Sequence, residues 1–346
     1  MTTVHIVGAG IAGLALASQL PARWDVHLHE AAWQEPTVPT LFALQAGGRR
    51  ALERLGLLEE FRRRCVTVTG GMLADGQGRP LVRMSGVEIT LLPRPELRDL
   101  LRSVLPHSVQ VHRHSVHSVT GLHADLVVGA DGVHSTVRRD FWGPASAARR
   151  LGATVIRGVI DADPVEGRFQ EVWRPDGIFG ITPRPGGGVN WFSTVPAQRF
   201  DSRAHALRHL RERWEGHAED PQRVLAHATE AQTLVNDVWV SRWPRRLVRS
   251  VPLRGAERHA VLLGDAAHAM APNLGRGANE ALIDAVALAR FLREDGSLPR
   301  SLRRYETARM LSPQVMRVGS TLMHRLSATR RDRLRNALLS AVPARG

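Results

Sequence analysis

The start of the chain places a glycine-rich turn directly after an apolar strand. Val4-His5-Ile6-Val7 precedes Gly8-Ala9-Gly10-Ile11-Ala12-Gly13, and residues with helical spacing follow. In this strand–GxGxxG–helix order, Gly8 makes the tight turn, Gly10 lets a pyrophosphate approach the backbone, and Gly13 packs the helix on the strand. The segment therefore predicts a parallel α/β sheet that binds a dinucleotide.

A second strand supports this prediction. Val26–His29 is strand-like and ends at Glu30, where an acidic residue is positioned to take a ribose hydroxyl of adenosine. Because the strand at Val4–Val7 begins almost at the first residue, we expect no secretory signal.

A long motif near residue 270 has the features of a second ligand-binding segment. The apolar strand His259–Leu263 ends at Asp265, a carboxylate that needs hydrogen-bond donors such as those of a polyol. Gly275 and Gly277 allow the backbone to approach a flat ligand. The N–H groups of 277–279 then open a helix, and a helix N-terminus stabilises an anion.

Two further segments complete the set of candidate site residues. The strand Ala124–Gly129 runs into Asp131-Gly132, where Asp131 is either a ligand contact or a helix N-cap. Arg94 opens a helix after Pro93, so its guanidinium either reaches the same ligand or is an ordinary solvated cation.

The middle of the chain predicts a different architecture. Strand-like runs broken by Pro and Gly cover 152–195 and indicate an antiparallel sheet, and 66–90 reads as a hairpin. Short strands are expected near Val109–His112 and Val116–Val119. We also expect helices over 44–57, 94–105, 202–214, 221–228 and most of 302–339, and a strand over 235–243.

Composition limits the class of protein. The formal charge is +14, and all 47 basic residues are arginine, because the chain has no lysine. The arginines are scattered and no nucleic-acid motif is present, so we expect no nucleic-acid partner. Cys65 is the only cysteine, which excludes an internal disulfide and fits a cytoplasmic location. No apolar run reaches the roughly 18 residues of a membrane span, so we expect no stable membrane insertion.

The three motifs together resemble those of the group A flavoprotein monooxygenases, the aromatic hydroxylase family with a para-hydroxybenzoate hydroxylase-like fold. They are Gly8–Gly13, Asp125–Arg138 and Gly264–Asn279, in the family's order, and the helical Arg94-Pro95-Glu96-Leu97 also matches. The resemblance runs from residue 3 to about 293. It implies a Rossmann-like FAD-binding domain, an inserted antiparallel-sheet substrate domain and C-terminal helices.

The resemblance also implies domain bounds and a cofactor site. The FAD domain would comprise 1–70, 94–148 and 249–300, the substrate domain 71–93 and 149–248, and the C-terminal helices 301–346. FAD would lie over Gly8–Gly13, with Glu30 at the adenosine ribose and Asp265 near the ribityl or pyrophosphate region. The residues implied to bind it are Gly8, Gly10, Ala12, Gly13, Glu30, Arg94, Val116, Asp131, Asp265, Pro272, Gly275, Gly277, Ala278 and Asn279.

The implied reaction is a monooxygenation. NADH or NADPH would reduce FAD, and O2 would add to give a C4a-hydroperoxide. One oxygen would then hydroxylate or epoxidise a small aromatic or polyketide-like substrate. The hydroperoxide decomposes in water, so the protein must supply a dry cavity. Phe179, Trp191 and Phe192 are candidate lining residues, although each is as easily a plain core aromatic. No metal is implied.

Alternatives remain open at this point. Flavin halogenases of this fold need a lysine and disulfide oxidoreductases need two cysteines, so both are excluded. A same-fold FAD reductase or dehydrogenase without oxygen transfer, or a non-redox FAD-bearing protein, is not. No catalytic base is identified; a histidine is favoured over Tyr305, the only tyrosine. We expect a monomer or homodimer.

Overall fold

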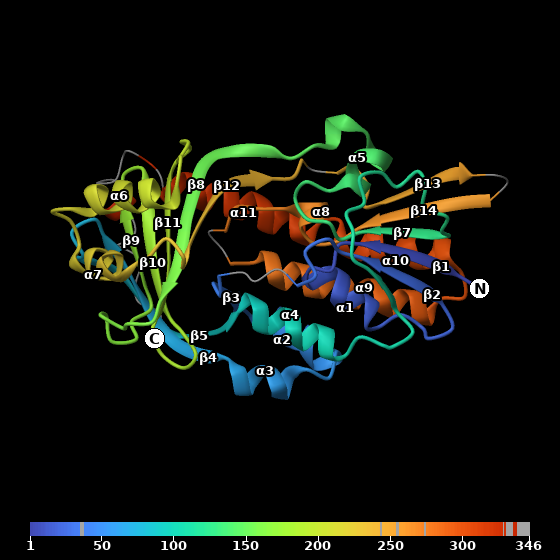
Figure 1. Ribbon diagram of the computed structural model, residues 1–346, viewed down its shortest axis with the longest axis horizontal. Helices are drawn as coiled ribbons and strands as arrows, with labels where there is room; N and C mark the ends of the chain where they lie inside the picture. The colour runs from blue at the N-terminus through green and yellow to red at the C-terminus, as the bar shows by residue number, and fades with distance from the viewer. Residues whose placement is uncertain are drawn as a thin grey trace.

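The computed structural model describes residues 1–34, 38–242, 244–253, 256–272, 275–327, 329 and 335–337. Its strands form two sheets, one of six strands and one of eight. The two sheets lie in opposite halves of the molecule, with helices between and around them (Figure 1). This is the expected α/β class, with a parallel and an antiparallel sheet.

The six-stranded sheet has the order β13-β14-β7-β1-β2-β6. Its strands pair in parallel except at β13–β14. The carboxyl ends of β14, β7 and β1 therefore lie side by side, which brings the three motifs to one edge of the sheet. The bounds are β1 Thr3–Val7, β2 Asp25–His29, β6 Gln110–His112, β7 Leu126–Gly129, β13 Val248–Leu253 and β14 Ala256–Leu262.

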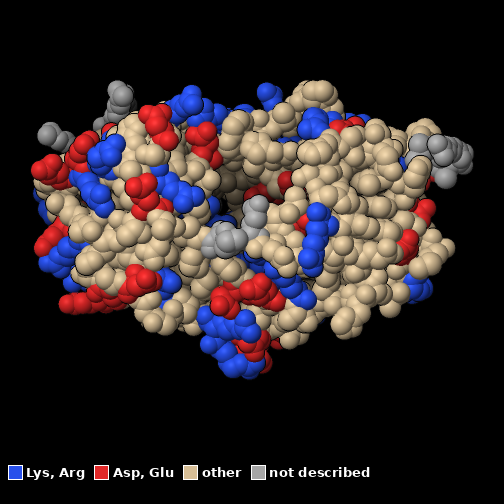
Figure 2. All heavy atoms as spheres, viewed as in Figure 1, with Lys and Arg blue, Asp and Glu red and all other residues tan. Residues whose placement is uncertain are grey.

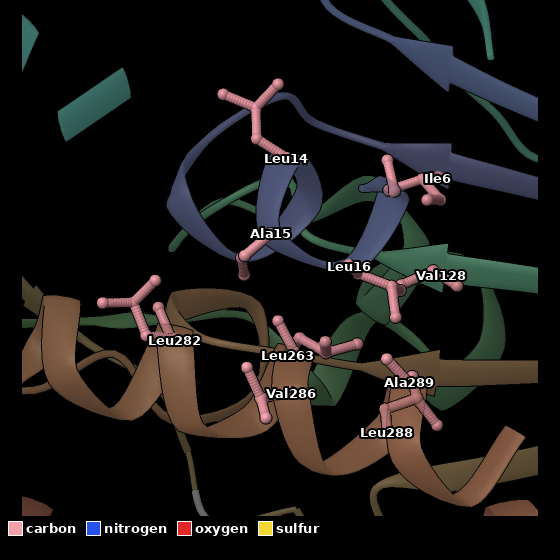
Figure 3. Packing of buried hydrophobic residues seen from close by; sticks show 14 of the residues in the cluster. Ile6, Leu14, Ala15, Leu16, Val128, Leu263, Leu282, Val286, Leu288 and Ala289 are labelled. Carbon is pink, nitrogen blue, oxygen red and sulfur yellow. The ribbon is translucent and has the colours of Figure 1, made fainter. Parts of the chain in front are cut away.

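Helices pack on one face of this sheet. Helix α1 presents Leu14 and Leu16, and α9 presents Leu282 and Val286, to a core that also contains Ile6 of β1 (Figure 3). All five side chains are at most 4% exposed, so helical spacing does mark the buried face. The helices of this half are α1 Ile11–Ala17, α2 Ala46–Arg54, α3 Leu58–Arg64, α4 Arg94–Ser103, α5 Thr136–Trp142, α8 Asp265–His268, α9 Gly277–Glu294 and α10 Leu298–Arg309.

The eight-stranded sheet has the order β12-β8-β11-β10-β9-β4-β5-β3. All neighbours pair antiparallel except β4 and β9. Helices α6 Arg203–Trp214 and α7 Glu219–His227 cover one of its faces, and α11 Ser312–Ser327 follows α10. The strands are β3 Leu41–Leu44, β4 Val66–Asp75, β5 Pro80–Pro93, β8 Arg149–Ile160, β9 Gln170–Arg174, β10 Gly177–Pro183, β11 Val189–Pro196 and β12 Thr233–Val240.

Two local expectations differ from the structure. Residues 116–119 form no strand, because side chains take their backbone groups: Val119 N–H donates to Asp140 Oδ2 at 2.9 Å, and Arg258 donates to Val119 O at 2.6 Å. Strand β3, which was not expected, pairs with β5 and joins the eight-stranded sheet. No helix of the described ranges combines the length and apolar composition needed to cross a bilayer.

Four histidines stack on the parallel sheet, and a fifth meets them edge-on. His5, His27, His29 and His112 come from β1, β2 and β6, and His114 follows β6. His5 Nδ1 lies 2.8 Å from His29 Nε2, and the His5 and His27 rings stack at 4.4 Å. Within the described chain, no group of histidines and acids is arranged to hold a metal ion.

This histidine stack makes the fold sensitive to acid. Burial, with the neighbouring histidines, lowers the pKa of His5 from 6.5 to about 4 and that of His29 to about 3. Asp25 opposes the shift at His5, and Arg258 adds to it. Between these pKa values and 6.5, the unfolded chain binds more protons than the folded chain does. The contribution of these two histidines to the free energy of unfolding is therefore fully present above about pH 6.5 and is lost as the pH falls toward 4.

We therefore expect the Tm to drop as the pH is lowered from 7 to 4.5. In the double variant His5→Val/His29→Val, the free energy of unfolding should depend less on pH. The slope should fall by up to about 1.4 kcal/mol per pH unit for each histidine whose protonation is lost. The measurement is thermal unfolding at several pH values, with exposed His107→Gln as the control. An unchanged slope in the double variant would contradict the assignment.

Candidate cofactor and substrate site

The glycine-rich turn between β1 and α1 has one open position. A Cβ on Gly8, whose φ is +100°, would lie 2.4 Å from Ala130 O, and a Cβ on Gly13 would lie 1.9 Å from Gly8 O. Both positions therefore require glycine. By contrast, a Cβ on Gly10 would meet only Ala130 O, at 4.0 Å. The space above Gly10 is open, as the approach of a pyrophosphate requires.

Glu30 lies beside this turn. Its Oε2 accepts the N–H of Ala9 at 2.9 Å, and its Oε1 accepts the N–H of Ala32 at 2.8 Å. The two bonds hold the carboxylate at the end of β2, where the ribose contact was predicted. Ala12 is buried in α1, and half-buried Val116 lies in the loop after β6.

Asp131 both caps a helix and keeps one oxygen without a partner. Its Oδ2 accepts the N–H groups of Thr136 at 2.7 Å and Val137 at 3.2 Å, at the start of α5. Its buried Oδ1 has no hydrogen-bond partner among the described residues. Burial raises the pKa of Asp131. An orphaned buried oxygen here suits a hydroxyl donor of a bound polyol.

Asp265 is the first residue of α8 and follows β14. Solvent reaches its side chain, but the surrounding protein removes much of the water near the carboxylate, and this desolvation raises the pKa of Asp265. None of the described donors forms a hydrogen bond to its carboxylate. The charges of His268, Arg94 and Arg138 oppose this rise in the pKa of Asp265. Figure 2 shows a recess between the two halves of the molecule, with acidic and basic atoms on its walls.

Arg94 lies in the same recess. Its guanidinium stacks over the Phe42 ring at 4.0 Å, and its Nε is buried without a partner in the described structure. Burial, helped by Arg157, lowers the pKa of Arg94 to about 9. Arg94 remains charged at neutral pH and supplies positive potential opposite Asp265.

The loop before α9 is tied to β3 and α2 by Asn279. Its Oδ1 accepts the N–H of Gln45 at 2.9 Å, and its Nδ2 donates to Ala43 O at 2.9 Å. Gly275 has a φ of +59°, and Gly277 and Ala278 begin α9. Pro272 precedes Asn273 and Leu274, which lie outside the described residues. The N-terminus of this 18-residue helix faces the recess side of Asp265, since a Cβ on Gly277 would lie 3.7 Å from Asp265 Oδ1.

A buried ionic network stabilises this loop. The sequence analysis did not predict it. Asp284 of α9 accepts from His268 Nε2 at 2.6 Å, from Gly264 N–H at 2.8 Å and from Arg309 Nε at 2.6 Å. Arg309 also donates to Glu280 at 2.6 Å. The sequence signal was a pair of acids, four residues apart, on the apolar face of α9.

The charges in this network stabilise one another. Burial alone would raise the pKa of Asp284, but His268 and Arg309 outweigh it and lower the value. Burial alone would lower the pKa of His268, and Asp284 raises it instead. His268 is therefore buried next to the motif and paired with Asp284 at 2.6 Å.

The aromatic candidates lie on two different faces of the eight-stranded sheet. Phe179 and Trp191 are fully buried under α6, with Phe179 stacked on Trp191 at 5.8 Å and in edge contact with Trp214 at 5.5 Å. Phe192 lies on the other face and packs against a cluster that contains Val155 and Ala271. Since Ala271 belongs to the loop before α9, Phe192 is the aromatic of the three that faces the recess.

The residues at the recess fit a flavin dinucleotide. Gly10 leaves room for a pyrophosphate, and Asp131 Oδ1 has no hydrogen-bond donor among the described residues. Asp265 supplies a negative charge and Arg94 a positive one. A helix N-terminus completes the set. When bound, FAD would supply the redox chemistry, and these residues would hold its phosphates, hydroxyls and ring.

Comparisons with known proteins agree with this geometry. The family model described as an FAD binding domain matches residues 107–317. Aurachin C monooxygenase/isomerase of Stigmatella aurantiaca is 31% identical over 335 residues, covering 89% of this chain and 85% of its own. The 3-amino-4-hydroxybenzoate 2-monooxygenase of Streptomyces cremeus is 31% identical over 340 residues, covering 89% and 83%.

A solved structure extends the likeness to the whole fold. Klebsiella pneumoniae HpxO, in its complex with FAD and uric acid, matches with a TM-score of 0.81 at 21% identity, covering 98% of this chain and 92% of that one. The fold and the recess thus define an FAD-binding oxidoreductase. With the identity to the curated relatives, the chain belongs to the group A FAD-dependent monooxygenases.

Proposed function

We propose that this enzyme uses NADH or NADPH to reduce bound FAD and then inserts one oxygen atom from O2 into a small aromatic or polyketide-like substrate. The observation that carries the proposal is the shared recess. The residues that fit FAD line one wall, and a sheet face with Phe192 forms the opposite wall. A substrate between them would lie next to the flavin ring.

The side chains support this use in three ways. Gly10 and the N-terminus of α9 provide the anion-binding elements, and Asp131 and Asp265 provide acceptors for the polyol. The helix end would also stabilise negative charge on the reduced ring. The sheet face excludes water from the reacting atoms, which limits wasteful decay of activated oxygen.

The comparisons support the type of reaction but do not identify the substrate. The two curated relatives are equally similar to this chain and bear the names of different monooxygenases. Their identity therefore does not choose the substrate. We propose that the enzyme acts alone or as a homodimer in the cytoplasm, without a nucleic-acid partner.

Oxygen uptake tests the proposal against the reductase alternative. The purified protein should show a flavin absorption band, and NADH or NADPH in air should drive O2 uptake that rises when an aromatic substrate is added. Flavin that is reduced under these conditions without O2 uptake would instead identify a reductase or dehydrogenase. Flavin that NAD(P)H does not reduce would identify a non-redox FAD-bearing protein.

A further inference from the structure

One side of helix α11 leaves its large apolar residues in solvent. Apart from Met1, these are the only large hydrophobic side chains of the described chain that are exposed, at 38% to 66%. They recur three or four positions apart, which places them on one side of the helix. They form a continuous surface, here called the apolar stripe, made of Leu311, Val315, Val318, Leu322 and Leu326.

The opposite side of α11 is polar and faces the protein. Its buried residues include Gln314, Ser320, His324 and Ser327. Ser320 Oγ donates a hydrogen bond to Ala271 O, in the loop before α9, and this bond fixes which side of the helix faces inward. A surface helix normally has the reverse arrangement, with its apolar side in the core. The apolar stripe is therefore directed away from the core, toward something outside this chain's described part.

The surroundings of the stripe are basic. Between Glu306 and Asp332 the sequence has no acidic residue, although it has five arginines. Arg325 is exposed on the same turn as Leu322 and forms no ion pair with a described carboxylate. Burial lowers the pKa of Arg317, and the positive charge of Arg149 lowers it further. A surface that combines apolar side chains with uncompensated positive charge favours an anionic partner.

A second copy of this chain matches the stripe poorly. Helix α11 has 16 residues, so the stripe is about 24 Å long, and with a width of roughly 10 Å it covers about 240 Å². Stable protein interfaces bury roughly 800 Å² on each partner. Two copies in contact here would also bring their arginines together. Both the area and the charge therefore disfavour a dimer through this helix.

An anionic lipid surface meets both requirements. A helix with leucine and valine on one side and arginine beside them lies in the plane of a bilayer surface, with its apolar side at the acyl boundary. Acidic headgroups then attract the cations. We infer that α11 docks reversibly on an anionic phospholipid bilayer through the apolar stripe, with Arg325 at the headgroups. This inference does not depend on the proposed function.

Vesicle binding tests the inference. The full chain is mixed with vesicles of phosphatidylcholine, with or without phosphatidylglycerol, and the bound fraction is measured by flotation. The wild type should bind the anionic vesicles at least about tenfold more tightly than the neutral ones. Raising the salt concentration from about 0.05 M to about 0.5 M should weaken this binding, because the headgroup attraction is screened.

Two variants separate the apolar and the charged contributions. Val318→Ser/Leu322→Ser should weaken binding to anionic vesicles at least about tenfold, whereas Val318→Leu keeps an apolar side chain and should bind like the wild type. Arg325→Gln should reduce the preference for anionic over neutral vesicles by about threefold or more. Arg223→Gln on α7 is its matched control, because it makes the same change in net charge at another exposed helix and should keep the preference.

Several results would overturn the inference. The wild type would bind neither kind of vesicle, or the double serine variant would bind as tightly as the wild type. Equal losses in Arg325→Gln and Arg223→Gln would show that net charge, and not this face, attracts the lipid. Light scattering adds one more outcome: a wild-type dimer that the double serine variant converts to a monomer, without vesicle binding, would assign the stripe to a second copy. Thermal unfolding of each variant confirms that it is folded.

Discussion

Asp284→Asn should lower the free energy of unfolding by about 3–5 kcal/mol, because it leaves buried cations without their shared partner. Asp284 is fully buried and joins His268, Arg309 and the backbone of Gly264. An amide keeps the shape but not the charge, so His268 should lose its raised pKa and Arg309 should remain charged. Denaturant unfolding of the apo- and FAD-loaded protein measures the loss.

Arg300→Gln provides the comparison for this variant. Arg300 lies on α10, as Arg309 does, but its side chain is 69% exposed beside Asp295. Exposed ion pairs contribute about 0–1 kcal/mol, so this variant should be nearly as stable as the wild type. Equal stability of both variants would mean that the Asp284 network does not support the cofactor loop.

Gly10→Val should weaken FAD binding by well over about tenfold while the apo-protein keeps its fold. Gly10 has an extended backbone at φ −74° and ψ −170°, which other residues adopt freely. Its side chain would enter the space above the turn, where a pyrophosphate must lie. Gly10→Ala should show a smaller loss, and fluorescence titration of the apo-protein with FAD measures both.

Two variants separate cofactor binding from folding. Gly121→Ala, in a loop where a Cβ meets no heavy atom within 4 Å, should leave FAD affinity unchanged. Gly13→Val should fail to fold properly, since its Cβ would overlap Gly8 O. If Gly10→Val bound FAD as tightly as the wild type, the pyrophosphate would not lie over this turn.

The parallel half of the fold was predictable because its motifs are local. Strand, glycine turn and helix follow one another within 20 residues, and the packing around Gly8 and Gly13 excludes any side chain there. The motifs of Asp131 and Asp265 are local too, because each residue follows a strand of the parallel sheet by two or three positions. Parallel pairing brings the carboxyl ends of the strands together, so the sequence alone predicts one site for these residues.

The face of the eight-stranded sheet could not be predicted. Residues 177–182 of β10 are all buried, because helices cover one side and the other half of the molecule covers the other. Alternation of polar and apolar residues, which normally marks the faces, is then lost. Phe179, Trp191 and Phe192 look equivalent in the sequence, and only the pairing register separates them.

The ionic network was missed for a related reason. Its paired residues are 16 to 29 positions apart along the chain, and one arginine among so many carries no distinguishing signal. The part of the network that the sequence does show is the pair of acids Glu280 and Asp284 on the apolar face of α9. A buried acid requires a cation, but its position in the sequence does not show which one.

Labelled oxygen tests the central claim most directly. The FAD-loaded enzyme is supplied with NADPH or NADH, with an aromatic substrate that stimulates oxygen uptake, and with dioxygen labelled with oxygen-18. Mass spectrometry then measures the mass of the product. The account predicts a product that carries one heavy oxygen atom from the gas. A product whose new oxygen comes from water, or flavin turnover that leaves every substrate unoxygenated, would contradict it.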